Sequence, residues 1–414
     1  MCTLNRLKAA INDAKLDVKE HIENINDDIN DQIENVITNI KDSLMTKEMQ
    51  EAVETVQFVL ERLKEFDKEA KQYDGYGFLL LALVKKAQLS QVNSPVIEPR
   101  TTRSIHHQLD NAKRFGQYAV QMYPLSWVSN LDSIAKSLGV SPEGILMVHF
   151  TDEADGGHCP KFILFLDHQV ESIVLSIRGT FCLKDAILDA VADEESFLHG
   201  KAHKGILHGA QKILSKVLDT IKENIHQYPS YSLTITGHSL GAGTAELITM
   251  ELMFTPGLIP DTTKVQCIAL APPPVFRSRT EIPSKISSAI NIYVNNYDCV
   301  PRLSLASVAR LLAAVRAVDD LGLSLTEQLA ILTNRSEDTD KIEKINEVVA
   351  KVHQDRFPDL DHPGTVYHIQ KSEENQKPVI LLSKSKIFTQ SILLLENMIL
   401  DHLHTSYENV LHNI

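Results

Sequence analysis

The sequence lacks two features that would define common classes of protein. Its longest uninterrupted apolar run is Phe78–Val84, about a third of the roughly 20 residues that a membrane-spanning helix needs. It also lacks an excess of basic residues. The 41 Lys and Arg are fewer than the 54 Asp and Glu, which gives a formal net charge of −13. Because nucleic acids bind basic surfaces, we expect no nucleic-acid partner. We also expect no membrane-spanning helix and no simple electrostatic docking to anionic lipid.

Cysteines are few and scattered. The chain has five, which is an odd number without CxxC spacing: Cys2, Cys159, Cys182, Cys267 and Cys299. This pattern favours neither a disulfide framework nor a structural zinc site. The N-terminus has no apolar signal-peptide core, and acidic residues begin at Asp13. We therefore predict a reducing, cytoplasmic location.

The first 45 residues carry an apolar stripe with an 11-residue repeat. Leu7, Ile11 and Ala14 begin it, and the same 4-3-4 spacing continues to Leu44. The average period of about 3.67 residues predicts one long amphipathic helix over about residues 4–45. Two interpretations stay open: a lipid-surface helix, or a helix packed on another helix or on a second copy of the chain. The acidic polar face and the absence of Trp and Phe from the stripe favour packing, and hence self-association.

The rest of the N-terminal region is also predicted to be helical. A second helix is expected near Glu51–Gln72, and the apolar segment Phe78–Lys86 is interpreted as a buried helix rather than a bilayer contact. Prolines and polar residues then indicate a linker. We place the helical N-terminal region at residues 1–89, the linker at 90–104 and a second domain at 105–414.

From residue 105 the pattern changes to alternating strands and helices. Two short apolar runs within 161–177 predict a hairpin. Helix-like and strand-like runs then alternate as far as residue 294, which is typical of an α/β fold with an open, mainly parallel sheet. Residues 304–360 interrupt this order with a mostly helical, charged insertion. The strands resume at 365–382, and a last helix is expected near Ser406–Leu411.

The strongest chemical signal is the run Gly237-His238-Ser239-Leu240-Gly241. It follows the strand-like residues 233–236 directly and precedes a helix-like segment. A G-x-S-x-G run between a strand and a helix predicts a nucleophile elbow, in which glycines permit the tight turn and the serine projects from the top of the sheet. The positive end of the helix dipole would lie beside the oxygen of Ser239.

A nucleophilic serine needs a base to take its proton and an acid to orient that base. In folds with this elbow the chain order is serine, acid, histidine. Asp298 follows the strand-like residues 291–294 in a loop, and it is the best acid candidate. His402 follows all the predicted strands and precedes the last helix, so it is favoured as the base. His368 reads as a strand residue.

Two further histidines are near the predicted base. His404 is a spare candidate, whereas His412 is interpreted as a solvated helix residue.

An oxyanion hole is also required, because donors aimed at the developing negative charge lower the reaction barrier. We expect it from the backbone N–H of Leu240 and from Thr180, at the end of an earlier strand. Arg178 is interpreted as a structural ion-pair partner.

These motifs, in this order, resemble those of class 3 lipases, in particular the diacylglycerol lipase branch. The resemblance covers about residues 105–411, and it rests on SIRGTFCLKDAILD (176–189), GKAHKGI (200–206), LTITGHSLGAGTAEL (233–247), ALAPPPVF (269–276), NNYDCVPRLSL (295–305), HPGTVYHI (362–369) and MILDHLHTSYENVL (398–411).

The resemblance implies an α/β-hydrolase fold, here with a mostly parallel central sheet, a preceding helical region and a helical insertion. It implies a triad of Ser239, Asp298 and His402, an oxyanion threonine at Thr180, and a mobile lid at about Cys182–Gly200.

Together these observations predict a serine lipase that hydrolyses acylglycerol esters, needs no metal or organic cofactor, and contacts a membrane or lipid-droplet surface transiently. Alternative interpretations are a phospholipase A1, an esterase of small esters, and a catalytically silent lipid-binding scaffold. Loss of a triad residue would signal the scaffold, and none is missing.

Overall fold

A computed structural model describes the protein over nine stretches of the chain: residues 77–91, 106–151, 159–180, 194–335, 339–352, 359–371, 378–383, 392–395 and 397–413. The chain divides into two compact units, Met1–Glu54 and Thr55–Ile414. Every described residue belongs to the second unit. The predicted 11-residue-repeat helix, the predicted helix Glu51–Gln72 and residues 92–104 of the predicted linker lie outside the described residues.

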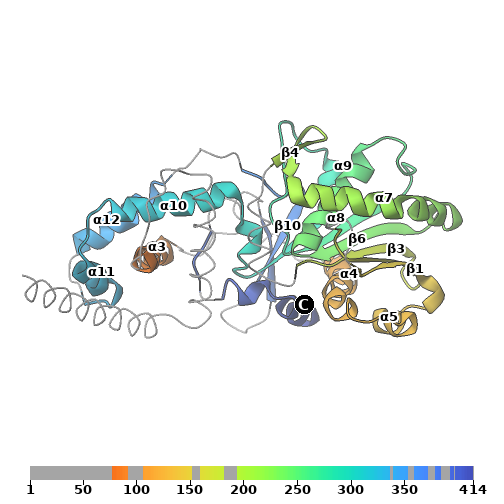
Figure 1. Ribbon diagram of the computed structural model, residues 1–414, viewed down its shortest axis with the longest axis horizontal. Coiled ribbons are helices and arrows are strands. Elements are labelled where there is room, and N and C mark those ends of the chain that lie inside the picture. Colours follow the sequence, from red (N-terminus) through yellow and green to blue (C-terminus); the bar gives the residue numbers. More distant parts are fainter. Residues whose placement is uncertain are drawn as a thin grey trace, which may run out of the picture. The chain divides into compact units, whose positions relative to one another are not determined.

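Helices and strands alternate through most of this unit (Figure 1). The α-helices are α3 (Gly77–Gln91), α4 (His106–Leu125), α5 (Leu131–Leu138), α7 (Lys204–Gln227), α8 (Leu240–Phe254), α9 (Ser284–Ser287), α10 (Leu305–Asp319), α11 (Leu325–Leu332), α12 (Thr339–Ala350) and α14 (His404–Asn413). Short 3₁₀ helices are η1 (Pro142–Gly144), η2 (Val300–Arg302) and η3 (Leu400–His402). The strands are β1 (Ile145–His149), β2 (Phe162–Asp167), β3 (Ser172–Ile177), β4 (Glu194–Phe197), β5 (Gly200–His203), β6 (Ser232–His238), β7 (Val265–Leu270), β8 (Phe276–Ser278), β9 (Ile290–Asn295), β10 (Thr365–Lys371) and β11 (Pro378–Ser383).

Eight strands form the main sheet, in the order β1-β2-β3-β6-β7-β9-β10-β11. The five strands from β3 to β10 are parallel, whereas β1, β2 and β11 add antiparallel edges. The predicted hairpin is present as β2 and β3, with Leu164 opposite Leu175. The prediction of an α/β fold with a mostly parallel central sheet is confirmed. Because parallel strands share a direction, loops after β3, β6 and β9 reach the same edge.

Helices cover both faces of this sheet (Figure 1). On one face, α7 and α8 pack against inward residues such as Phe162 and Leu164 of β2. On the other face, α4 and α14 pack against the alternate residues Ile163 and Phe165. All six residues of β2 are buried. A strand covered on both sides reads as a continuous apolar run, which explains why alternation is absent from its sequence.

A second, three-stranded sheet has the order β4-β5-β8. The ion pair between Arg277 and Glu194, at 2.8 Å, joins β8 to β4. This sheet includes the last residues of the lid that the resemblance implied at about Cys182–Gly200. Residues 194–200 are therefore a strand and turn of a sheet rather than part of a separate lid, and residues 181–193 lie outside the described residues.

The helical insertion and α3 form one module, which we call the helical module (α3, α10, α11 and α12). Leu79, Leu83 and Val84 of α3 are fully buried, and α3 packs against the three insertion helices. The predicted buried helix is thus confirmed. α3 belongs to the same compact unit, Thr55–Ile414, as the strands of the main sheet. Its leucines leave water against the insertion helices.

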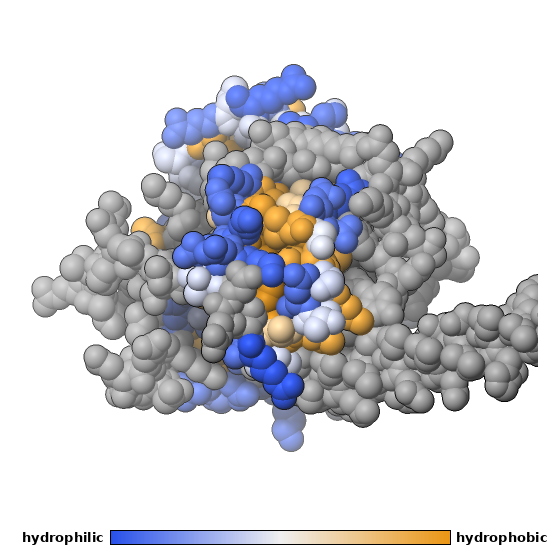
Figure 2. All heavy atoms as spheres, turned by 90° about the vertical axis from the view of Figure 1, so that its left-hand side faces the viewer, coloured by the Kyte–Doolittle hydropathy of each residue, from blue (hydrophilic) through white to orange (hydrophobic). Residues whose placement is uncertain are grey.

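Serine caps start two helices of the module. Ser304 forms a capping box at the start of α10, and Ser324 forms one with Glu327 at the start of α11. Figure 2 faces this module and shows apolar residues gathered between hydrophilic ones. Among the described residues, no helix combines the length and the apolar character needed to cross a membrane.

Candidate active site

The turn between β6 and α8 places Ser239 at the carboxyl edge of the sheet. Ser239 has φ 59° and ψ −130°, a region that side-chain-bearing residues rarely adopt. Its backbone N–H donates to Leu270 O on the neighbouring strand at 2.9 Å. A Cβ on Gly237 would lie 2.4 Å from the carbonyl of Gly241, so the strand and the helix approach this closely only because that position is glycine.

Three side chains from distant parts of the chain meet at this turn. His402 Nε2 lies 2.9 Å from Ser239 Oγ. His402 Nδ1 lies 3.0 Å and 3.1 Å from the two carboxylate oxygens of Asp298. With Nδ1 donating to the carboxylate, Nε2 is left to accept the hydroxyl proton of Ser239. The structure therefore brings all three predicted triad residues into one hydrogen-bonded chain.

Asp298 is fully buried and surrounded by donors. Besides His402, the Val300 N–H donates to Oδ1 at 2.9 Å and the Tyr407 hydroxyl donates to Oδ2 at 2.8 Å. Tyr407, from α14, also accepts a hydrogen bond from Asn295 N–H at 2.8 Å. Burial, together with the Asp298 charge, raises the pKa of Tyr407 well above its usual value. Tyr407 therefore stays a neutral donor that stabilises the carboxylate.

The loop that carries His402 is fastened to the loop that carries Asp298. The Asp401 carboxylate accepts hydrogen bonds from the Asn296 side chain at 2.9 Å and from Tyr297 N–H at 3.1 Å. The Asn295 side chain donates to Asp401 O at 3.0 Å. These contacts fix the acid and the base relative to each other before any substrate binds, which is the preorganisation that catalysis requires.

His238 is a part of the site that the sequence analysis missed. Its Nε2 donates to the backbone oxygen of His402 at 2.9 Å, and its Nδ1 accepts from the Tyr123 hydroxyl at 2.7 Å. Burial lowers the pKa of His238 well below its usual value, so its ring stays neutral. The residue thereby supports the backbone of His402. Its place beside Ser239 in the motif was the one available signal.

One predicted oxyanion donor, Leu240, directly follows Ser239, and the loop that carries the other, Thr180, approaches Ser239. Leu240 is the first residue of α8, and N–H groups at a helix start have no acceptor within the helix. The loop after β3 approaches Ser239 closely, since a Cβ on Gly179 would lie 3.0 Å from Ser239 Cβ and 2.4 Å from His238 O. Thr180, half-buried, follows at once.

Arg178 holds this loop in place. Its side chain donates to Ser126 Oγ at 3.0 Å and to the carbonyl of Gly179 at 3.2 Å. These contacts join the loop after β3 to the end of α4. These hydrogen bonds give Arg178 a structural role, and the ion pair expected from the sequence stays a prediction.

The alternative histidines have other contacts. His368 lies in β10 and its Nε2 donates to Asn296 O at 2.6 Å; burial lowers its pKa to about 4. The ring of His404 stacks on Tyr123 at 4.3 Å. His412 is exposed near the end of α14. Of the four candidates, His402 is the one whose ring bridges Ser239 and Asp298.

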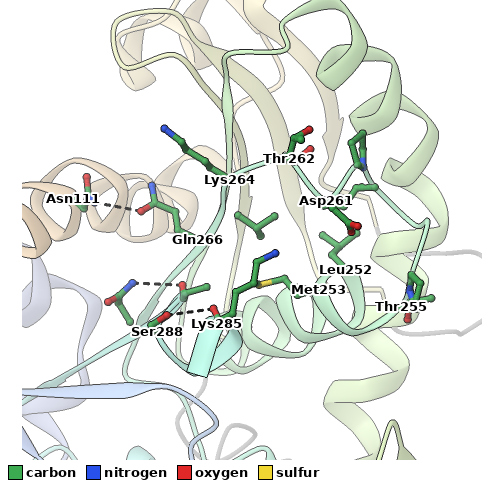
Figure 3. Close-up of a pocket in the computed structure, with 17 residues that line it drawn as sticks. Asn111, Leu252, Met253, Thr255, Asp261, Thr262, Lys264, Gln266, Lys285 and Ser288 are labelled. Carbon is green, nitrogen blue, oxygen red and sulfur yellow. Dashed lines mark hydrogen bonds between the residues drawn. The ribbon is translucent and has the colours of Figure 1, made fainter. Parts of the chain in front are cut away.

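A cavity of about 650 Å³ lies at the opposite edge of the sheet (Figure 3). The starts of β7 and β9 and the end of α8 line it, and Lys264, Lys285 and Asp261 are among its lining residues. It contains no triad residue, because Ser239 follows the other end of β6. Within the described stretches, no group of three or more His, Cys, Asp or Glu side chains could hold a metal ion.

A nucleophile elbow on a mostly parallel sheet, with a Ser–His–Asp chain at its carboxyl edge, defines the architecture of an α/β serine hydrolase. Residues 174–308, which include the elbow and Asp298, match the family model described as Lipase (class 3). The resemblance to class 3 lipases predicted from the sequence is therefore confirmed over this segment.

Relatives of two kinds match the chain. Diacylglycerol lipase-beta from Mus musculus is 30% identical over 184 residues, which are 42% of this chain and 26% of that protein. Diacylglycerol lipase-alpha from Homo sapiens is 28% identical over 172 residues, 38% of this chain and 16% of that protein. Among solved structures, lipase II from Rhizopus niveus aligns with a TM-score of 0.47 and 19% identity, covering 72% of this chain and 94% of that one. The matched segment thus spans about a quarter or less of the two diacylglycerol lipases.

Proposed function

We propose that this protein is a serine lipase that hydrolyses carboxylic ester bonds of acylglycerols. The observation that carries the proposal is the continuous chain of hydrogen bonds from Ser239 Oγ through His402 to Asp298. A serine hydroxyl becomes a strong nucleophile when a base accepts its proton during attack. His402 is within reach to do so, and Asp298 holds the ring in the required tautomer.

In the first half of the reaction, Ser239 Oγ forms a bond to the ester carbonyl carbon while its proton moves to His402 Nε2. The resulting imidazolium is stabilised by the buried Asp298 charge. The carbonyl oxygen becomes negative and accepts hydrogen bonds from the N–H groups of Thr180 and Leu240. Such donors are typically worth about 3–4 kcal/mol each in the transition state. The glycerol oxygen then leaves with the proton of His402.

In the second half, water replaces the alcohol product, which for diacylglycerol is a monoacylglycerol. His402 takes a proton from that water, the hydroxide oxygen attacks the acyl carbon, and Ser239 recovers its proton as the bond to the acyl group breaks. The products are a free fatty acid and regenerated enzyme. The residues named here complete this cycle without a metal or an organic cofactor.

The substrate class follows from the relatives rather than from the triad, which suits many esters. The two mammalian relatives are named diacylglycerol lipases, so we propose diacylglycerol as the first substrate to test, presented at a lipid surface. A cytoplasmic location is part of the proposal, and the described cysteines Cys267 and Cys299 are free, buried thiols.

The test is fatty-acid release from emulsified diacylglycerol by the wild type and by Ser239→Ala and His402→Ala. We expect turnover by the wild type and a loss of several orders of magnitude in both variants. His412→Ala is the matched control, because this histidine is exposed. Release only from phospholipid would replace the substrate class with that of a phospholipase A1, and release only from dissolved short esters would make the protein an esterase. An inert wild type would contradict the proposal.

A further inference from the structure

The segment that leads to the catalytic base is held by a side chain from much earlier in the chain. We call residues 392–395 and 397–402 the base segment. Gln88, on α3, donates from Nε2 to the carbonyl of Ile392 at 2.9 Å, and its Oε1 accepts a hydrogen bond from the Leu394 N–H at 3.0 Å. One side-chain amide thus pairs both a backbone carbonyl and a backbone N–H, as an adjacent strand would. Because Ile392 and Leu394 are buried, these hydrogen bonds are costly to lose.

Backbone hydrogen bonds continue from this contact to both the acid and the base of the triad. Met398 N–H donates to Leu395 O at 3.3 Å, and Met398 O in turn accepts a hydrogen bond from Cys299 N–H at 3.1 Å. Cys299 directly follows Asp298, and the base segment ends at His402. The part of the chain that Gln88 holds is therefore the part that sets the position of the base relative to the acid.

α3 itself is anchored in the helical module. The helix lies among α10, α11 and α12 (Figure 1), and its side chains Leu83 and Val84 are fully buried. Lys86 donates to the carbonyl of Ile331 on α11 and, at 2.6 Å, to the side-chain oxygen of Asn334. The amide of Gln88 therefore has a fixed support from which to hold the base segment.

We propose that Gln88 is a positioning residue for the reaction, because it holds the base segment so that His402 stays within reach of Ser239 and Asp298. This inference rests on the proposed function, since it concerns the same base. The helical module is then joined to the site twice, by the chain that follows Asp298 and by the Gln88 amide before His402. A displacement of about 1 Å at a catalytic group can cost about a hundred-fold in rate, so the position of α3 controls catalysis.

Two variants of Gln88 test this role in the full-length protein. Gln88→Met keeps the length of the side chain and removes both hydrogen bonds, whereas Gln88→Glu keeps the acceptor and places an oxygen against the carbonyl of Ile392. On a dissolved short-chain ester at pH 8, we expect kcat to fall at least about ten-fold in both variants, with KM changed by less than about two-fold. Labelling of Ser239 by a fluorophosphonate should slow by the same factor as kcat.

Lys86→Met is the matched control on the same helix. It removes the hydrogen bonds to Ile331 and Asn334 and leaves those between Gln88 and the base segment. Urea unfolding of each variant should show a loss of stability for Lys86→Met as well as for Gln88→Met. The value of kcat for Lys86→Met should stay within about two-fold of the wild type, since the base segment keeps its support.

Three results would overturn the inference. Unaltered kcat in Gln88→Glu or Gln88→Met would show that the base keeps its position without these bonds. Equal losses of kcat in Gln88→Met and Lys86→Met would assign the effect to the packing of α3. Loss of cooperative unfolding in both Gln88 variants would mean that this residue supports the fold rather than the base. An inert wild type would contradict the proposed function itself, whereas an active wild type with fully active Gln88 variants would contradict this inference alone.

Discussion

Ser239 occupies a strained backbone conformation, and the residues around it hold it there. Positive φ at a residue with a side chain costs on the order of 1–3 kcal/mol, yet the turn is fixed by the hydrogen bond from its N–H to Leu270 and by the packing of α8 on the sheet. His402 and Asp298 are fixed in turn by His238, Asp401 and Tyr407. The site is therefore arranged before substrate arrives.

Tyr407 gives a first prediction at this scale. Tyr407→Phe removes the hydroxyl that donates to Asp298 and accepts from Asn295 N–H. We expect the free energy of unfolding to fall by about 1–3 kcal/mol, because buried partners lose a hydrogen bond, and kcat on a dissolved ester to fall as well. Urea unfolding and steady-state kinetics measure the two effects.

Tyr118→Phe is the matched control for Tyr407→Phe. It removes the buried hydrogen bond from the Tyr118 hydroxyl to Asp167, which is 2.7 Å long. Asp167 ends β2 at the opposite edge of the sheet from the triad. Tyr118→Phe should lower stability and leave kcat unchanged. A Tyr407→Phe variant with unaltered kcat would show that this hydroxyl does not support the acid.

His368 gives a prediction for pH. Its pKa is about 4 in the folded chain, lowered by burial, against 6.5 as the ordinary value. Between these values the unfolded chain binds more protons, so stability falls as pH drops from about 6.5 to about 4, by on the order of 3 kcal/mol. His368→Gln, measured by urea unfolding at pH 7 and pH 4, should lose less stability than the wild type. Equal losses would contradict the assignment.

The triad residues were predictable from the sequence, whereas the residues that support them were not. Ser239 sits in a local motif, and the order of strands left few positions for Asp298 and His402. The contact between Tyr123 and His238 joins residues 115 positions apart, and no local pattern encodes such a pair. The sequence therefore identifies His238 only as a residue of the G-x-S-x-G motif and not as a support of His402.

At the scale of elements, α3 gives the clearest prediction. Leu83 is fully buried against the insertion helices, whereas Leu89 on the same helix is 49% exposed. Leu83→Ala should lower the free energy of unfolding by about 2–5 kcal/mol, and Leu89→Ala should change it by less than about 0.5 kcal/mol. Urea unfolding of both variants measures this. Similar small effects would mean that α3 is not part of the core.

The helices and strands also show which parts of the fold a sequence pattern does not predict. All strands of the main sheet except β1 were predicted, because each of them is a short apolar run; β1 (Ile145–His149) lies at the sheet edge, is only partly buried and was missed. The β4–β5 pair was not predicted, since Glu194–Phe197 is short and acidic and pairs its Glu194 with Arg277 of a strand far along the chain. The burial of α3 depends on helices more than 200 positions later, which a linker-like composition at 90–104 does not reveal.

At the scale of the whole molecule, the two compact units predict the effect of truncation. A chain of residues 55–414 should keep its unfolding transition and its hydrolysis of a dissolved ester, because it retains α3. Removal of residues 1–91 deletes α3 and should abolish cooperative unfolding. If the N-terminal repeat mediates self-association, gel filtration will show a larger assembly for the full chain than for 55–414. The same number of chains per assembly in both proteins would contradict that role.

The central claim is that His402 activates Ser239. The most direct measurement is covalent labelling of the protein with a fluorophosphonate, followed by mass spectrometry of the modified peptide. The account predicts modification of Ser239 in the wild type and in His404→Ala, and at least a hundred-fold slower labelling in His402→Ala. An unlabelled wild type, or a His402→Ala variant labelled at the wild-type rate, would contradict it.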